Sequence, residues 1–117
     1  MERAQRLRKG EEFDRVYREG AVTTGPFFVL RVLPNALGHA RWGFAVGKGL
    51  SKRAVVRNRI KRRLREAVRT ALPGAVGSYD IVVTARGRSV EASFSTLSGA
   101  LGKQLSRANV LEASLAP

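Results

Sequence analysis

The sequence predicts a mixed α+β fold, in which helices pack on one sheet. Apolar and aromatic runs of strand length alternate with segments whose apolar residues recur at helical spacing. The chain has 117 residues and 44% hydrophobic side chains, which is enough for one core. It contains no Cys, which excludes disulfides, Cys-ligated metals and a thiol nucleophile. We therefore expect a single domain over residues 1–117.

The first element is expected to be a short helix, EEFDRVYREG (11–20). Phe13, Val16 and Tyr17 recur at helical spacing and form a narrow apolar stripe. Gly20 follows the stripe, and glycine is typical of helix ends. This helix should pack its stripe against the sheet.

Three runs are expected to be strands. GPFFVLRVLP (25–34) and ARWGFAVG (40–47) are joined by a polar loop, which predicts an antiparallel hairpin. SYDIVVTAR (78–86) is almost unbroken in apolar character, which predicts a central strand covered on both faces. A further short strand is considered around residues 49–56.

Two more helices are expected. The basic stretch RNRIKRRLRE begins one that Pro73 and Gly74 should end. Its apolar residues share one sector when projected at 100° per residue; they are Ile60, Leu64, Ala67, Val68 and Ala71. The last helix should run from about residue 93 to 111, with an amphipathic pattern.

The positive charge is concentrated in one part of the chain. The formal net charge is +13, and eleven basic side chains with Glu66 as the single acid lie within residues 41–69. A local patch of this kind attracts a polyanion. Because Arg presents a planar fork of donors that matches phosphate, the excess of Arg over Lys agrees with a nucleic-acid partner.

The basic helix should present a ridge of side chains to solvent. Asn58, Arg62, Arg65 and Arg69 fall opposite the apolar sector, at i, i+4, i+7 and i+11. Neighbouring Arg residues repel each other in the free protein, and a phosphate backbone would remove that cost and release counterions. We therefore interpret the ridge as a nucleic-acid surface rather than a solvated helix face.

RNA is favoured over DNA. Strands flank the basic helix on both sides, whereas a helix-turn-helix needs a neighbouring helix. Aromatic side chains are available for stacking on unpaired bases: Phe13, Tyr17, Phe27 or Phe28, Trp42 and Phe44. A groove between the first helix and the strand carrying Phe27 and Phe28 could hold a single strand.

The sequence does not indicate catalysis by the chain itself. His39 is the only His, so an acid and base pair of His is excluded. The acids gather on the first helix instead of near the basic surface, so a metal-dependent nuclease site is not expected. No export signal or membrane span is seen, which predicts a cytoplasmic protein without a membrane partner.

Several motifs resemble the protein subunit of bacterial ribonuclease P. AVVRNRIKRRLREAVR (54–69) resembles that family's basic signature, RLRKGEEFDRVYREG (6–20) its opening pattern, and RWGFAVGK (41–48) and YDIVVTAR (79–86) two of its strands. The resemblance implies a two-layer α-β sandwich like the second domain of ribosomal protein S5, with a left-handed βαβ crossover through the basic helix. It also implies that an RNA subunit with bound Mg²⁺ removes the 5′ leader from precursor tRNA.

The resemblance implies three groups of site residues and no catalytic residue in this chain. Contacts to the RNA subunit are expected from Arg57, Asn58, Arg59, Lys61, Arg62, Arg65 and Arg69. The cleft for the leader is expected to include Phe13, Tyr17, Phe28 and Arg31, the last where the family often has an aromatic residue. A basic loop before the signature carries Lys48, Lys52 and Arg53.

Mg²⁺ is expected to be held mainly by the RNA subunit, and the sequence leaves open which protein residues, if any, contact it. The expected partners are ribonuclease P RNA and precursor tRNA, and no DNA. A structural ribosomal protein is the alternative, because it would also be small, basic and free of Cys. A DNA-binding regulator is less suited, because neither a dimer surface nor a groove-reading helix is found.

Overall fold

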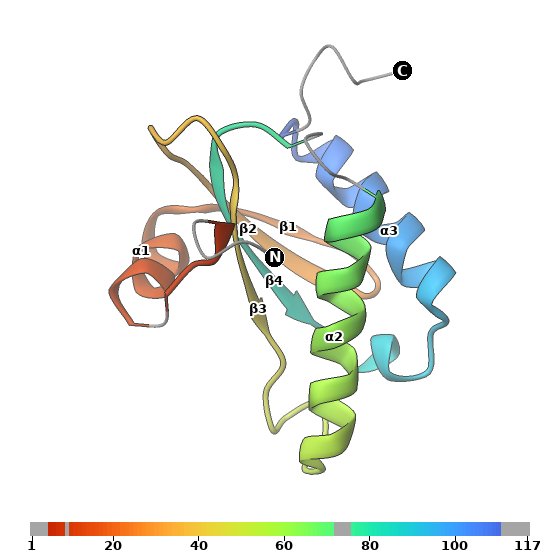
Figure 1. Ribbon diagram of the computed structural model, residues 1–117. Coiled ribbons are helices and arrows are strands. Elements are labelled where there is room, and N and C mark those ends of the chain that lie inside the picture. The colour runs from red at the N-terminus through yellow and green to blue at the C-terminus, as the bar shows by residue number, and fades with distance from the viewer. Residues whose placement is uncertain (1–4, 9, 72–75, 111–117) are drawn as a thin grey trace.

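The computed structural model describes residues 5–8, 10–71 and 76–110 of the chain. Its elements confirm the α+β prediction (Figure 1). They are α1 (Glu11–Glu19), β1 (Ala21–Thr24), β2 (Phe28–Pro34), β3 (Arg41–Ala45), α2 (Ala54–Ala71), β4 (Tyr79–Ala85), the short 3-10 helix η2 (Gly87–Val90) and α3 (Phe94–Arg107). No helix within the described ranges is both long and apolar enough to cross a membrane.

The four strands form one mixed sheet in the order β1-β2-β4-β3. β2 pairs antiparallel with β1 and with β4, whereas β3 and β4 are parallel. The predicted hairpin of 25–34 with 40–47 is therefore wrong, because β4 lies between these strands. β4 is buried along most of its length, so a central place gives its apolar side chains cover on both faces.

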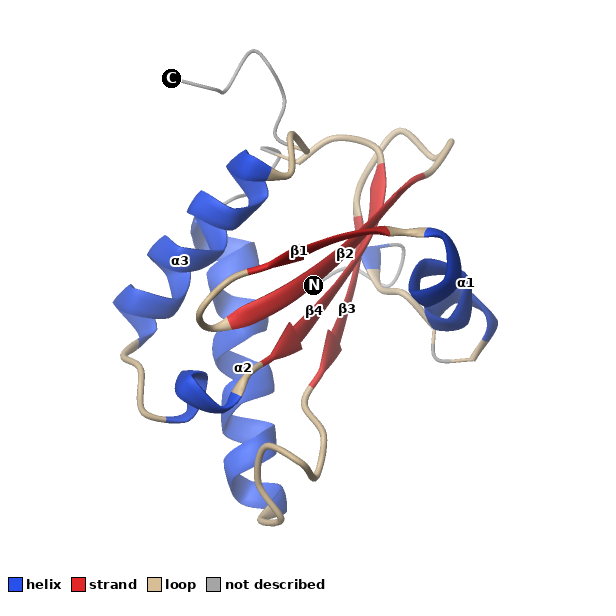
Figure 2. Cartoon of the chain, turned by 180° about the vertical axis from the view of Figure 1, so that it is seen from behind, coloured by secondary structure: helices blue, strands red, loops and turns tan. Residues whose placement is uncertain are grey.

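α2 connects the parallel strands β3 and β4. Figure 2, seen from behind, shows both strands pointing downward, with β4 to the left of β3 and α2 beyond the sheet. This arrangement is a left-handed crossover, an exception to the strong right-handed preference. It agrees with what the family resemblance implies.

Two details of the strand prediction fail. β1 was missed because it has only four residues and is mostly exposed at the sheet edge, so it carries no apolar run. β1 and β2 form the hairpin, and its turn lies at residues 25–27, closed by a hydrogen bond from the Gly25 amide to the Phe28 carbonyl. The short strand considered around 49–56 is absent, because this segment forms a turn and then enters α2 at Ala54.

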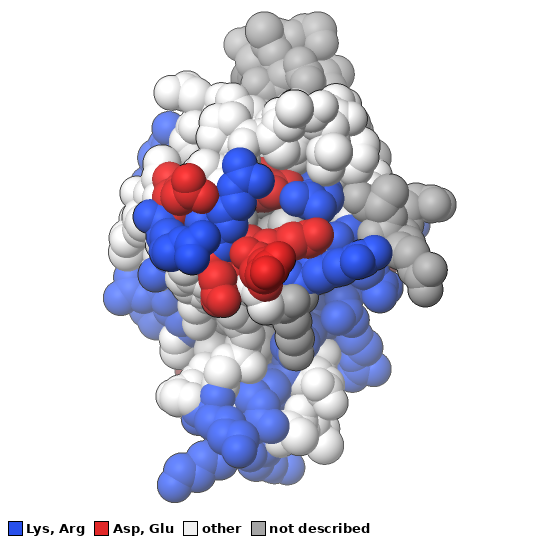
Figure 3. Space-filling model, turned by 90° about the vertical axis from the view of Figure 1, so that its left-hand side faces the viewer, with Lys and Arg blue, Asp and Glu red and all other residues white. Residues whose placement is uncertain are grey.

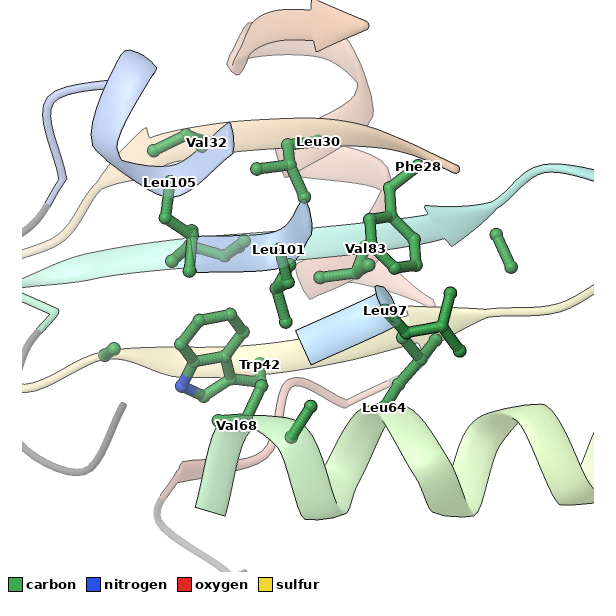
Figure 4. Packing of buried hydrophobic residues seen from close by; sticks show 14 of the residues in the cluster. Phe28, Leu30, Val32, Trp42, Leu64, Val68, Val83, Leu97, Leu101 and Leu105 are labelled. Carbon is green, nitrogen blue, oxygen red and sulfur yellow. The ribbon is translucent and has the colours of Figure 1, made fainter. Parts of the chain in front are cut away.

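α2 and α3 cover one face of the sheet and enclose the main core. Its large, fully buried side chains include Ile60 and Ile81. They also include residues that Figure 4 labels: Phe28, Leu30, Leu64, Leu97, Leu101 and Leu105. Burying each such side chain contributes about 1.5–3 kcal/mol. Because Ile60 and Leu64 lie in this core, the opposite face of α2 must face solvent.

α1 packs on the other face of the sheet, as Figures 1 and 2 show. Leu7, Val16 and Val82 form the buried centre of a second, smaller cluster there. Phe13, Leu33 and Ala45 pack around it. Only part of that sheet face is covered, which leaves space beside α1.

The helix ends agree with the sequence for α1 but not for α3. α1 ends at Gly20 as predicted. α3 ends at Arg107, four residues before the predicted end, because Asn109 adopts a left-handed conformation with φ 59°. Pro73, Gly74 and Leu111, which the prediction used as helix ends, lie outside the described residues.

Candidate nucleic-acid interface

The outer face of α2 carries the basic ridge, defined here as Asn58, Arg62, Arg65 and Arg69. All four side chains are exposed, as the helical projection predicts. On the opposite face, Ile60, Leu64, Ala67 and Val68 are buried. Packing of the apolar face on the sheet therefore fixes the direction in which the ridge points.

The ridge is not uniformly unpaired, although its neighbouring Arg residues were expected to repel each other. Arg69 donates two hydrogen bonds to the carboxylate of Glu66, of 2.6 and 3.1 Å. The hydrogen bond from Arg69 lowers the pKa of Glu66, which stays ionised at neutral pH. Arg62 and Arg65 form no hydrogen bond or ion pair with any other described residue, so these two carry the available charge of the ridge.

Three other basic residues of α2 differ in what they contact. Arg57 is half-buried, and its Nη1 donates a 2.9 Å hydrogen bond to the carbonyl of Ser51. Arg57 thereby ties the preceding loop to the helix. Arg59 is half-buried, and its Nε is buried without a hydrogen-bond partner within the described chain. Lys61 flanks the apolar sector, as predicted, and faces a hollow next to α1.

The basic loop precedes α2. Lys48, Lys52 and Arg53 are all exposed there. Two backbone amides shape the loop: that of Leu50 donates to the carbonyl of Gly47, and that of Arg53 donates to the hydroxyl of Ser51. These three cations therefore extend the positive surface beyond the start of the ridge.

The face that carries α1 is divided by charge. Figure 3 shows the acids gathered in one area over α1, with Lys and Arg around them. The lower part of the same view shows Lys and Arg without acids. A polyanion would be directed away from the acids and toward the lower part.

α1 holds Phe13 against the middle of β3. The ring of Phe13 lies over Gly43, so close that a Cβ on this residue would overlap the ring. Gly43 is buried and lies opposite Val82 in the parallel ladder. The absence of a side chain at Gly43 is therefore what lets the ring lie on the strand.

Tyr17 and Arg31 meet one turn further along α1. The guanidinium carbon of Arg31 lies 4.5 Å from the centre of the Tyr17 ring, a cation–π contact. Tyr17 is 42% exposed, whereas Arg31 is half-buried. The ring of Tyr17 and the charge of Arg31 thus lie together beside the part of the sheet that α1 does not cover.

Two hollows lie between α1, β3 and α2. One, of about 370 Å³, is lined by Gly10, Phe13, Asp14, Tyr17, Phe44, Ala45, Val46, Gly47 and Lys61. The other, of about 150 Å³, is lined by Arg6, Leu7, Phe13, Trp42, Gly43, Phe44, Lys61 and Arg65. Phe13, Phe44 and Lys61 line both, so we call the two together the α1–β3 cleft.

The cleft differs in two ways from the predicted one. Phe28 is fully buried in the main core, on the face of the sheet opposite α1, so it cannot line the cleft. Strand alternation explains the error: Phe28 shares its face with Leu30, whereas Arg31 points to the side of α1. The groove follows β3 instead of β2.

Phe44 and Lys61 also line the cleft, although neither was predicted to. Phe44 was only one of several aromatic candidates, and Lys61 was assigned to the RNA-subunit surface. The signal for Phe44 would have been an edge position of its strand, since an edge side chain can reach past the sheet. Only the strand order of the folded sheet, in which β3 comes last, shows that edge, and an isolated bridge from Arg6 to Trp42 touches it at one point.

A buried ion pair holds α1 at the other end of the cleft. Arg41 donates hydrogen bonds to both carboxylate oxygens of Asp80, at 2.8 and 2.7 Å, and a third to the carboxylate of Glu12 in α1, at 3.2 Å. Burial alone would raise the pKa of Asp80, but hydrogen bonds from Arg41 and Asn35 and the charge of Arg41 outweigh it and hold that pKa below its usual range. Asp80 is therefore a structural anion.

The described residues offer no metal cage. No three of their His, Asp and Glu side chains gather as a metal-binding group. His39 lies in a loop, where its Nδ1 is 3.2 Å from the carbonyl of Ala40. The described part of the chain therefore shows no site at which protein side chains alone would hold Mg²⁺.

Comparisons with known proteins agree with these features. Residues 1–109 match the model of a family described as Ribonuclease P. The chain is 39% identical over 111 residues to the ribonuclease P protein component of Caldanaerobacter subterraneus subsp. tengcongensis, covering 95% of each chain. It is 43% identical over 115 residues to that of Roseiflexus sp. (strain RS-1), covering 97% of this chain and 93% of the relative.

Solved structures show the same fold. The ribonuclease P protein of Staphylococcus aureus superposes with a TM-score of 0.84 at 31% identity, covering 94% of this chain and all of that chain. The protein from Thermotoga maritima superposes with a TM-score of 0.80 at 28% identity, covering 87% of this chain and 96% of that one.

Proposed function

Because the chain belongs to the ribonuclease P protein family and is the protein component of that tRNA-processing ribonucleoprotein endoribonuclease, we propose how its two surfaces divide the work. The basic ridge binds ribonuclease P RNA, and the α1–β3 cleft holds the single-stranded 5′ leader of precursor tRNA. The observation that carries this proposal is the position of an aromatic cleft directly beside an exposed ridge of Arg residues.

The ridge suits an RNA backbone. Arg62 and Arg65 are exposed and have no partner within the described chain, so both can bind phosphate without breaking an existing ion pair. Side chains one turn apart on a helix are ~5–6 Å apart, close to the repeat of phosphates along a strand. Release of counterions from the RNA would supply much of the binding free energy. Arg59 and the exposed cations of the loop, Lys48, Lys52 and Arg53, extend the ridge.

The cleft suits an unpaired strand. Phe13 and Tyr17 offer ring faces, and stacking contributes about 1–3 kcal/mol per base without selecting a sequence. Lys61 and Arg31 supply positive charge next to those rings. Only precursor tRNA carries a 5′ leader, so a cleft for that strand distinguishes the substrate from the product.

Arg65 links the two surfaces, because it belongs to the ridge and also lines the cleft. A leader leaving the cleft would therefore pass close to the RNA bound on α2. In this proposal the protein positions the leader relative to the catalytic RNA and lowers the repulsion between two polyanions. Catalysis belongs to the RNA subunit.

Mg²⁺ enters this proposal as an ion of the RNA. Phosphate oxygens of the RNA subunit would hold it, and when bound it would activate water and stabilise the leaving oxygen. The protein would lower the Mg²⁺ concentration that the RNA requires, because its cations offset phosphate charge. We further propose that the chain acts as one RNA-binding domain in the cytoplasm, where precursor tRNA is processed.

Cleavage of a labelled precursor tRNA by a bacterial ribonuclease P RNA at low Mg²⁺ tests the proposal. A correct 5′ cut that requires the protein is expected. The matched control is the double variant Arg62→Glu/Arg65→Glu, which should fold and fail to stimulate cleavage. Equal stimulation by the variant, or tight binding to ribosomal RNA without any stimulation, would contradict the assignment.

A further inference from the structure

A third hollow, of about 400 Å³, lies away from the basic ridge and the α1–β3 cleft. The β1–β2 turn forms one wall with Gly25, Pro26 and Phe27, and α3 forms the other, chiefly with Gly99, Lys103 and Arg107. We call it the turn–α3 groove. It shares no lining residue with the cleft.

The groove is rigidly built. Gln104 is 3% exposed, and its Nε2 donates hydrogen bonds to the carbonyls of Thr23, at 2.7 Å, and Phe28, at 3.1 Å. A Cβ at Gly25 would overlap the Gln104 amide, so the turn lies directly on this side chain. Arg86 adds a 2.8 Å hydrogen bond from its Nη1 to the carbonyl of Gly25. The two walls are therefore held at a fixed separation.

The charge at the groove has one sign. Lys103 and Arg107 are exposed and lie one turn apart on α3. Arg88 is exposed, and its guanidinium carbon lies 5.7 Å from the centre of the Phe27 ring. None of the residues lining the groove is acidic. Two cations at helical spacing next to an aromatic ring suit a sugar–phosphate backbone.

Gly99 leaves part of the groove wall without a side chain. It lies inside α3, where glycine costs about 0.5–1 kcal/mol relative to alanine. A Cβ at Gly99 would have no atom within 4 Å, so no contact within the described chain requires glycine there. The bare backbone lines the groove next to Lys103. Close approach of an external backbone is a physical use for a glycine at this position.

We propose that the turn–α3 groove is a second contact for ribonuclease P RNA, which binds one stretch of its sugar–phosphate backbone. This inference rests on the proposed function, since it takes the RNA subunit as the partner. α2 and α3 lie in one layer on the same face of the sheet, whereas α1 lies on the other (Figures 1 and 2). RNA bound along α2 is thus on the side of the sheet that carries the groove.

Two variants test the groove in binding assays with full-length ribonuclease P RNA. Lys103→Glu/Arg107→Glu should weaken binding at least about tenfold near 0.15 M salt and reduce the salt slope by roughly 1.4–1.8, the value for two phosphate contacts. Gly99→Leu should raise the melting temperature of the free protein while weakening RNA binding. A purely structural glycine would not give these opposite effects.

The controls match the variants in chemistry. Gly102→Leu makes the same change at another α3 glycine that has open space around its Cβ position and does not line the groove, so RNA binding should stay unchanged. Arg15→Glu/Arg18→Glu makes the same change of charge on α1. Binding of precursor tRNA to the assembled holoenzyme is measured separately for every variant.

Unchanged RNA-subunit binding by both groove variants would overturn this inference. A loss confined to precursor tRNA would overturn the assignment to the RNA subunit. In either case the ridge variant Arg62→Glu/Arg65→Glu reports on the proposed function separately. If the ridge variant weakens RNA binding while the groove variants do not, the proposed function stands and only the second contact is wrong.

Discussion

The ring of Phe13 lies on the backbone of Gly43, in space that any other residue would fill with its Cβ. Phe13 comes from α1 and Gly43 from β3, so this contact sets how closely the helix approaches the strand. The same ring lines both hollows of the α1–β3 cleft. The width of the proposed leader site thus depends on Gly43, although this residue has no side chain with which to contact the RNA.

Gly43→Ala should weaken precursor tRNA binding by the holoenzyme, because the added methyl displaces the Phe13 ring. Phe13→Ala gives the upper limit, a loss of about 5- to 150-fold if the ring stacks on one base. Binding of mature tRNA and of the RNA subunit should stay nearly constant. Gly49→Ala is the control, since a Cβ there meets nothing within 4 Å. A loss shared equally by precursor and mature tRNA would argue against leader recognition.

Arg31 should make leader binding sensitive to salt. If its guanidinium, held over Tyr17, contacts one leader phosphate, Arg31→Gln will reduce the salt slope of precursor tRNA binding by about 0.7. Titrations at several salt concentrations measure this slope. Tyr17→Phe keeps the ring and serves as the control. An unchanged slope with Arg31→Gln would exclude Arg31 from phosphate contact.

The cleft should be separable from the ridge through Phe13, since Arg65 belongs to both surfaces whereas Phe13 lines only the cleft. Arg62→Glu/Arg65→Glu should weaken binding of ribonuclease P RNA and lower its salt slope, because two exposed cations are lost. Phe13→Ala should leave this binding nearly intact. Arg15→Glu/Arg18→Glu, with the same change of charge on α1, is the control. If the ridge variant and Phe13→Ala weakened both RNAs equally, the division into two surfaces would be wrong.

The Arg41–Asp80 pair should make stability fall in acid. The pKa of Asp80 is lower in the folded state than in the unfolded chain, where it is about 3.9. The pair therefore stabilises the fold fully above that pH, and this contribution is lost as the pH falls through the folded pKa. Urea unfolding of Asp80→Asn between pH 7 and pH 3 should show a flatter pH dependence than the unchanged protein.

The Arg41–Asp80 pair should also contribute measurably to the free energy of unfolding at neutral pH. Arg41→Met should lower the free energy of unfolding by about 3 kcal/mol, since it leaves a buried carboxylate without its cation. For the variant Asp80→Asn, which removes a buried acid, the control is Asp14→Asn, which removes an exposed acid from α1. Parallel pH profiles for Asp80→Asn and the unchanged protein would show that the pair does not contribute as described.

Sulfate or phosphate should stabilise the free protein, because anions that bind the ridge bind only the folded state. The melting temperature is compared with that in chloride at matched ionic strength. The increase should be smaller for Arg62→Glu/Arg65→Glu. A melting temperature unaffected by sulfate would count against an anion-binding ridge.

The periodicity of the chain determined the basic ridge and the central strand. Ile60 and Leu64 must be buried, so Arg62 and Arg65 must point to solvent, whatever surrounds the helix. The apolar run of β4 required cover on both faces in the same way. These predictions hold because they depend on local spacing alone.

Tertiary structure decided the sheet order and the cleft. Strand alternation separates Phe28 from Arg31 but does not say which face α1 will cover, so Phe28 was assigned to the wrong side. The place of β4 between β2 and β3 put β3 at the edge and brought Phe44 and Lys61 beside Phe13. Strand pairings of this kind join residues far apart in the sequence. They are stabilised by packing between distant segments, which a local sequence pattern does not predict.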